Sequence, residues 1–172
     1  MNRRQSTATV AAVLASAALL GCSDDSPTGP GDGIQDLDWS ADMESGETLE
    51  IRGVNGSILA VAAGGNTARV TADKDSEDSP LSSVTFEVVT HTGGVTICAM
   101  YPDVDGQPPN ECRPGGGQMT VRDNDVTVEF EVRVPEGVRL VEWTVNGNVR
   151  ATEVRSDVEA FTVNGTASIT TS

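Results

Sequence analysis

Residues 143–170 read WTVNGNVRATEVRSDVEAFTVNGTASIT, and this stretch decides the fold. The pair Asn146-Gly147 returns as Asn164-Gly165, 18 residues later. Valine recurs every nine residues at Val145, Val154 and Val163. Because Asn and Gly tolerate positive φ, they suit corners that β-branched residues cannot turn. Stacked coils need equal lengths whereas hairpins do not, so the fixed spacing favours a solenoid with 18 residues in each coil.

The rest of the domain is also built of strands. A third copy of the corner, Val54-Asn55-Gly56-Ser57-Ile58, lies upstream, and residues 126–134 alternate strictly between apolar and polar side chains. No helical stripe occurs outside the first 21 residues. We therefore predict an all-β domain over residues 47–172, a right-handed β-solenoid with side hairpins over 81–135. The alternative is a β-sandwich in which each Asn-Gly pair makes a two-residue hairpin turn.

The order of these motifs resembles a bacterial domain of unknown function that is described as a putative adhesin. The resemblance rests on the copy at 54–58, the strand ending at 132–138, and Thr144-Val145-Asn146-Gly147-Asn148-Val149, and it covers about residues 47–172. It implies a β-solenoid on the cell envelope, with no established catalytic residues. This chain departs from the family by the insertion that carries Cys98 and Cys112, and by stopping one strand past a corner. Either the last coil ends bare, which invites pairing with another copy or a partner, or the chain is a fragment that lacks further C-terminal coils.

The N-terminal residues predict a lipoprotein signal. Arg3 and Arg4 precede an apolar run over 8–20 that is too short to span a bilayer, and Gly21 then precedes Cys22. We expect residues 1–21 to be a signal peptide. Leu19-Leu20-Gly21-Cys22 resembles the bacterial lipoprotein signal, which implies that Cys22 is multiply acylated and tethers the chain to the lipid bilayer.

The residues after Cys22 indicate the destination and a spacer. Ser23 resembles the choice that sorts lipoproteins to the outer membrane, so we expect a lipid-anchored protein of the bacterial cell envelope, on the periplasmic face of the outer membrane or at the cell surface. Residues 22–46 are rich in Ser, Asp, Gly and Pro and have little apolar surface. We expect them to form a flexible spacer.

Two cysteines remain once Cys22 is assigned to lipid. In an oxidising compartment, Cys98 and Cys112 are expected to form a disulfide that closes a loop of 15 residues. A metal site is the alternative reading of this pair, but it would need more ligands than two cysteines supply.

Charge limits the range of partners. The chain holds 26 acidic and 11 basic residues, a net charge of −15, and no run of basic residues. Nucleic acid is therefore excluded as a partner. Acidic clusters occur at 73–78, 103–106 and 123–125, but none matches the twelve-residue calcium loop. We expect solvated acidic loops and no metal or cofactor, with a calcium-stabilised module as the alternative.

Catalytic motifs are sparse. His91 is the single histidine and lies in a turn, and no nucleophile or phosphate-loop motif occurs. We therefore expect a non-catalytic lipoprotein that serves adhesion or envelope scaffolding by contacting an envelope protein or a glycan. The alternative is a β-helix enzyme that cleaves polysaccharide with a pair of carboxylates.

Overall fold

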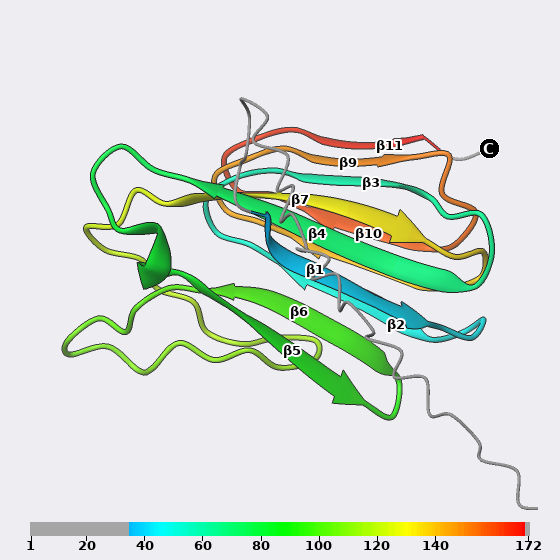
Figure 1. Cartoon of the computed structure of the whole chain (residues 1–172), viewed down its shortest axis with the longest axis horizontal. Helices are drawn as coiled ribbons and strands as arrows, with labels where there is room; N and C mark the ends of the chain where they lie inside the picture. Colours follow the sequence, from blue (N-terminus) through cyan, green and yellow to red (C-terminus); the bar gives the residue numbers. More distant parts are fainter. Residues whose placement is uncertain (1–34, 171–172) are drawn as a thin grey trace, which may run out of the picture. The chain divides into compact units, whose positions relative to one another are not determined.

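Residues 35–170, the part that the computed structural model describes, fold into two mixed β-sheets (Figure 1). Sheet A has the strand order β1-β4-β7-β3-β9-β11, and sheet B has the order β10-β8-β2-β6-β5. The strands of sheet A are β1 (Gln35–Asp42), β3 (Ile58–Ala62), β4 (Thr67–Asp75), β7 (Thr127–Val134), β9 (Val149–Thr152) and β11 (Ala167–Thr170). Those of sheet B are β2 (Thr48–Arg52), β5 (Thr85–His91), β6 (Gly94–Met100), β8 (Arg139–Trp143) and β10 (Val158–Phe161). A short 3-10 helix, η1, spans Leu81–Ser83.

The two sheets share one hydrophobic core. Alternate residues of each strand point inward, as β7 shows with Val128, Phe130, Val132 and Val134 buried between exposed charges. Across the core, the rings of Phe86 on β5 and Phe130 on β7 meet edge to face, with centroids 5.9 Å apart. The period-two pattern of the sequence therefore reports which face of each sheet is buried.

The Asn-Gly pairs lie where the chain crosses from sheet B to sheet A. They follow β2, β8 and β10 and precede β3, β9 and β11, so none of them is the turn of a two-residue hairpin. The connected strands stack in parallel: Leu140 faces Leu49 on one side and Val158 on the other. In sheet A, Val149 lies between Ile58 and Ala167 in the same way. The 18-residue spacing thus corresponds to one step along both sheets.

The prediction of an all-β domain is confirmed, but a solenoid is not shown. Both sheets are open, and β1, β4 and β5 join their neighbours in antiparallel orientation. These antiparallel strands interrupt the uniform parallel stacking that a solenoid needs. Two mixed sheets facing each other over one core are consistent with a sandwich-like arrangement.

The spacer expected over residues 22–46 does not extend through residues 35–42, because these form β1 at the edge of sheet A. Leu37 and Trp39 alternate with Asp38 and Ser40 and pack against the core, where Trp39 faces Val70 across the strand pair. This short alternation was the signal for a strand. The expected signal peptide, Cys22 and residues 23–34 lie outside the described residues. Within the described part, no helix is long and apolar enough to cross a membrane.

Candidate functional site

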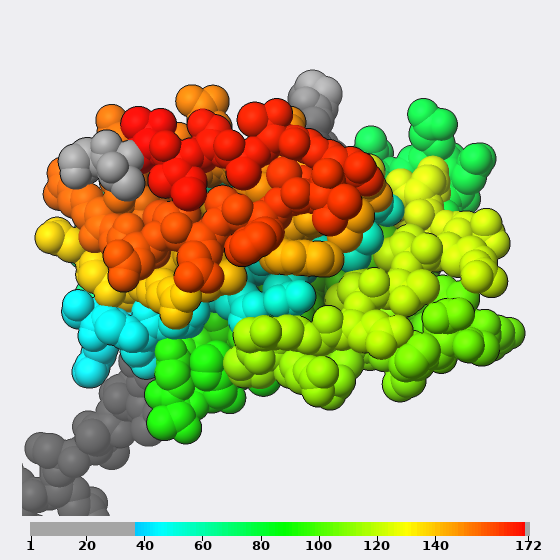
Figure 2. Space-filling view, turned by 180° about the vertical axis from the view of Figure 1, so that it is seen from behind, coloured from blue at the N-terminus to red at the C-terminus, as the bar shows by residue number. Residues whose placement is uncertain are grey.

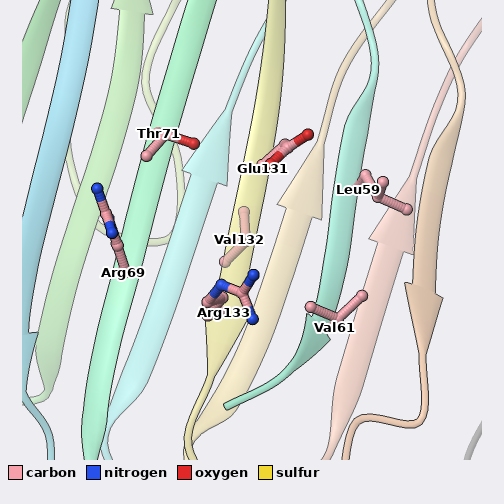
Figure 3. A pocket seen from close by; sticks show the side chains of 7 residues that line it. All are labelled: Leu59, Val61, Arg69, Thr71, Glu131, Val132 and Arg133. Atoms are coloured by element: carbon pink, nitrogen blue, oxygen red, sulfur yellow. The ribbon is translucent and has the colours of Figure 1, made fainter. Parts of the chain in front are cut away.

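A groove of about 370 Å³ crosses the outer face of sheet A, the face turned away from sheet B (Figure 3). Strands β3, β4 and β7 supply its side chains. The residues that line it include Leu59, Val61, Arg69, Thr71, Glu131 and Arg133. The groove is therefore apolar on the β3 side and charged on the side of β4 and β7.

Strand register explains why these residues meet. Arg69 lies directly opposite Arg133, and Thr71 opposite Glu131, in the antiparallel pair β4–β7. On the other side of β7, Leu59 pairs with Glu131 and Val61 with Arg133. All of them alternate with buried neighbours, so their side chains share the outer face.

The arginines of this face differ in their partners. Asp38 accepts hydrogen bonds from Nε and Nη2 of Arg69 at 2.9 and 2.8 Å, and this pairing raises the pKa of Arg69. Arg133 makes no hydrogen bond or ion pair with any described residue. The same is true of Arg150, which faces Leu59 from β9. Two exposed guanidinium groups thus flank Leu59, whose side chain is 42% exposed.

This arrangement suits a ligand with both apolar and anionic parts. A guanidinium offers a planar fork of N–H donors that fits a carboxylate, and it also packs against flat groups. The arginines come from positions 69, 133 and 150, so no basic run marks them in the sequence. Only the pairing of β4, β7, β3 and β9 brings them to one face.

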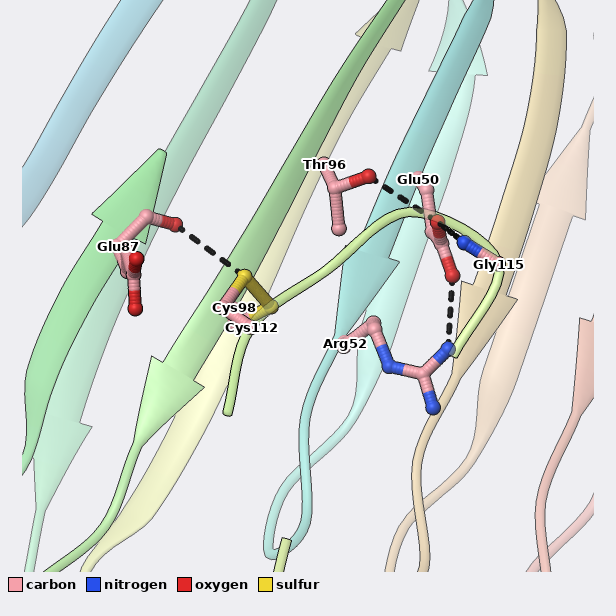
Figure 4. The surroundings of a disulfide bond; sticks show 7 residues. All are labelled: Glu50, Arg52, Glu87, Thr96, Cys98, Cys112 and Gly115. Carbon is pink, nitrogen blue, oxygen red and sulfur yellow. Dashed lines mark hydrogen bonds and ion pairs between the residues drawn. A yellow bond between two sulfur atoms is a disulfide. The ribbon is translucent and has the colours of Figure 1, made fainter. Parts of the chain in front are cut away.

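The second notable region is the loop tethered by a disulfide, which covers the outer face of sheet B (Figure 4). A disulfide joins Cys98 on β6 to Cys112, with Cα atoms 5.9 Å apart. Residues 94–99 of β6 are buried on both faces, as this covering requires. Asn110 braces the loop by donating from its amide to the carbonyl oxygens of Tyr101 and Thr120, each at 3.0 Å.

Glu50 fastens the same loop to β2 (Figure 4). Its Oε2 accepts hydrogen bonds from the N–H of Gly115 at 2.8 Å and from the hydroxyl of Thr96 at 3.1 Å. Its Oε1 pairs with Nη1 of Arg52 at 2.7 Å, and Arg52 lies over the ring of Trp143. Because every oxygen of this buried carboxylate has a partner, we assign Glu50 a structural role.

The acidic clusters brace loops. The carboxylate of Asp125 accepts hydrogen bonds from the N–H groups of Glu77, Asp78 and Ser79, at 2.8, 2.9 and 2.8 Å. Hydrogen bonds from Ser79 and Asp78 hold the pKa of Asp125 well below its ordinary value. In the cluster at 103–106, Asp103 accepts the N–H of Asn110 at 2.7 Å. Between residues 35 and 170, no three His, Cys, Asp or Glu side chains are placed to hold a metal ion.

Two other titratable residues lie away from the groove. His91 ends β5, and its Nδ1 accepts the N–H of Gly93 at 3.2 Å within the turn. Glu142 points into the core from β8, on the same face as Leu140, and neither of its oxygens has a hydrogen-bond partner. Burial raises its pKa to about 8. The sequence signal for the burial of Glu142 was its spacing of two residues from Leu140, which places both side chains on the same face of the strand.

Comparison with solved structures finds a distant likeness. No family model matches the chain, and no curated protein matches it. Among solved structures, it is similar to a putative cell adhesion protein from Clostridium sporogenes, with a TM-score of 0.35 and 8% identity. The match covers 75% of this chain and 58% of that protein, so the chain spans less than two thirds of its length.

Proposed function

We propose that the protein is a non-catalytic lipoprotein of the bacterial envelope, and that the groove of sheet A contacts an envelope protein or a glycan for adhesion or surface scaffolding. Support comes chiefly from Arg133 and Arg150, two exposed arginines that have no partner among the described residues, beside the exposed Leu59. Arginine is enriched at protein interfaces, and exposed apolar surface also marks them.

The same proposal includes the anchor and the coil interpretation. Cys22 carries the acyl chains, and these attach the chain to the bilayer. The three units β2–β3, β8–β9 and β10–β11 act as short coils of a solenoid, because each crosses between the sheets at an Asn-Gly corner and stacks in register on the next. Their regular stacking provides a rigid support for the groove.

Capture from solubilised envelope tests the binding face. The immobilised chain is compared with the double variant Arg133→Gln/Arg150→Gln and with Arg155→Gln, which removes an exposed arginine from a corner elsewhere. We expect the double variant to lose the captured protein or glycan and Arg155→Gln to retain it. Equal capture by all three would refute the assignment of this face.

Acyl labelling in a bacterial host tests the anchor separately. We expect the wild-type chain to incorporate labelled fatty acid and to sediment with membranes, and Cys22→Ser to do neither. Unchanged membrane retention of Cys22→Ser would rule out the lipid anchor while leaving the binding face to be judged by its own experiment.

A further inference from the structure

Among the described strands, β10 and β11 leave one end of both sheets uncovered. Within residues 35–170, β10 pairs only with β8 and β11 only with β9. Three of the five large hydrophobic side chains that are exposed lie here: Phe161, Val163 and Ile169. In Figure 2 the orange and red surface of these coils lies beyond the cyan β2–β3 unit, on the side away from the green strands β5 and β6. Backbone groups and apolar side chains are therefore open to a partner together.

The ladder of asparagines at the corners also stops at this edge. The amide of Asn146 donates to Oδ1 of Asn55 at 2.9 Å, and that of Asn164 donates to Oδ1 of Asn146 at 2.8 Å. Among the described residues, no donor reaches Oδ1 of Asn164. An incoming chain would therefore find a hydrogen-bond acceptor as well as two strand edges.

The edge carries little charge, which is unusual in this chain. Residues 160–170 carry no charged side chain, although 22% of all residues are charged and the net charge is −15. Proteins commonly protect exposed edge strands with charges, proline or bulges, and β11 has none of these. Glu159 of β10 is the one charged side chain in these two strands, and it is paired with Arg139 on the outer face. Two copies can therefore approach through this edge without direct repulsion between like charges.

Two-fold symmetry makes the edge complementary to itself. Ala167 and Ile169 share the inward face, since they continue the rows of the buried Val149 and Ala151. A rotation that sets β11 antiparallel to its copy brings these inward side chains together, and the same rotation brings β10 to its copy. We propose that a second copy of this chain docks on the β10–β11 edge, so that both sheets continue across the two-fold axis.

The β10–β11 edge is distinct from the other features of sheet A. β1 lies at the opposite end of the sheet from β11. The groove lined by β3, β4 and β7 is separate from this edge, so pairing does not depend on the proposed binding function.

Sedimentation equilibrium of residues 23–172 tests the proposal without interference from an acyl chain. This polypeptide contains the core of the described domain, whose buried apolar residues lie between Met43 and Val154. We expect a reversible equilibrium between monomer and dimer. Ile169→Lys should weaken it by about tenfold or more, because it places an unpaired charge in the apolar contact. Val88→Lys is the matched control and should not change the equilibrium, because Val88 is a comparably exposed apolar residue on the far edge of sheet B.

Hydrogen exchange locates the contact. In the wild-type chain, amides of β11 should become protected as the concentration rises, while the amides of β5 stay unchanged. Circular dichroism checks that Ile169→Lys retains the fold, which is expected because Ile169 is exposed on the last strand. A wild-type chain that stays monomeric at its highest soluble concentration overturns the proposal. So does a dimer that Ile169→Lys leaves intact.

Discussion

Glu142 is the residue whose environment conflicts most with its chemistry. It lies in the core of the domain between Ile51 and Ala160 on the neighbouring strands, and neither carboxylate oxygen has a partner. The charged residues next to it in those strands are Glu50, Arg52 and Glu159, and all three alternate to the opposite face. Because no nearby group offsets its burial, the folded protein holds Glu142 in the protonated form at neutral pH.

Glu142 therefore makes stability depend on pH. Burial raises its pKa from 4.5 to about 8, so between these values the folded chain keeps a proton that the unfolded chain releases. Stability contributed at this site falls as the pH rises through that range and levels off above it. At pH 7 the loss amounts to about 3 kcal/mol.

Replacing this carboxyl by an apolar group should stabilise the protein. We expect Glu142→Leu to unfold at higher urea concentration than the wild type, with a gap that widens from about pH 5 to about pH 9. Glu129→Leu, an exposed acid on β7, removes the same charge and is the control. A gap that is constant with pH, or equal in the two variants, would contradict the proposed burial of an unpaired carboxyl.

At the scale of elements, the corners depend on glycine for close contact between stacked units. A Cβ built on Gly147 would collide with the carbonyl oxygen of Gly56, and one built on Gly165 would collide with that of Gly147. The hydroxyl of Thr144 fills the neighbouring space by donating to the same Gly56 carbonyl at 3.0 Å. Each corner therefore fits closely against the previous one.

A methyl group at this corner should separate the stacked units. We expect Gly147→Ala to lower the free energy of unfolding by about 3 kcal/mol, as overpacking against backbone that cannot move away does. Gly64→Ala is the control, because nothing lies within 4 Å of a Cβ at that position. Chemical denaturation of both variants checks this, and equal stabilities would show that the corners can part without loss.

The loop over sheet B depends on its disulfide. Reducing the bond between Cys98 and Cys112 should lower the stability by about 3 kcal/mol, the value that chain entropy gives for a loop of this length. The loop would also leave Glu50, whose hydrogen bond to Gly115 then breaks. Thermal unfolding with and without reductant measures the loss. The double variant Cys98→Ser/Cys112→Ser should unfold at the same temperature in both conditions, because it has no disulfide to reduce. A midpoint unchanged by reductant in the wild type would show that packing alone holds the loop.

Local sequence patterns predicted where the strands lie better than they predicted which strands pair with each other. Alternation over 126–134 predicted β7, and the Asn-Gly repeats predicted where the chain turns. The antiparallel placement of β4 beside β7 depends on contacts between distant segments, which no local pattern records. β5, in contrast, pairs with its sequence neighbour β6, as the prediction of side hairpins over 81–135 allows. The groove was missed for the same reason, since Arg69, Arg133 and Arg150 meet only through strand pairing. Glu142 shows the limit at a single position, because its spacing from Leu140 is typical of a buried residue whereas its charge is typical of an exposed one.

At the scale of the whole molecule, the net charge of −15 opposes any contact between copies. At the edge itself, the pairing of Glu159 with Arg139 limits direct repulsion, but the charges on the rest of each copy still act through the solvent. The screening length falls from about 30 Å at 0.01 M salt to about 8 Å at 0.15 M. Salt should therefore strengthen pairing through β10 and β11.

Sedimentation at the two salt concentrations measures this effect. We expect the wild-type dimer to be tighter at the higher concentration, because apolar and backbone contacts at the edge are little affected by screening. Ile169→Lys should remain largely monomeric at both. A dimer that dissociates as salt is added would mean that ion pairs hold the two copies together. The apolar and backbone groups of the β10–β11 edge could not then be the main contact.

The repeated corner also determines how the length of this protein can change. Because each corner uses the same set of hydrogen bonds as the one before it, a tandem duplication of 18 residues would insert a complete new layer and leave the existing layers as they are. Insertion of a single residue would instead shift every inward side chain beyond it to the outside. Growth or shortening by whole repeats is thus the change of length that this architecture accommodates.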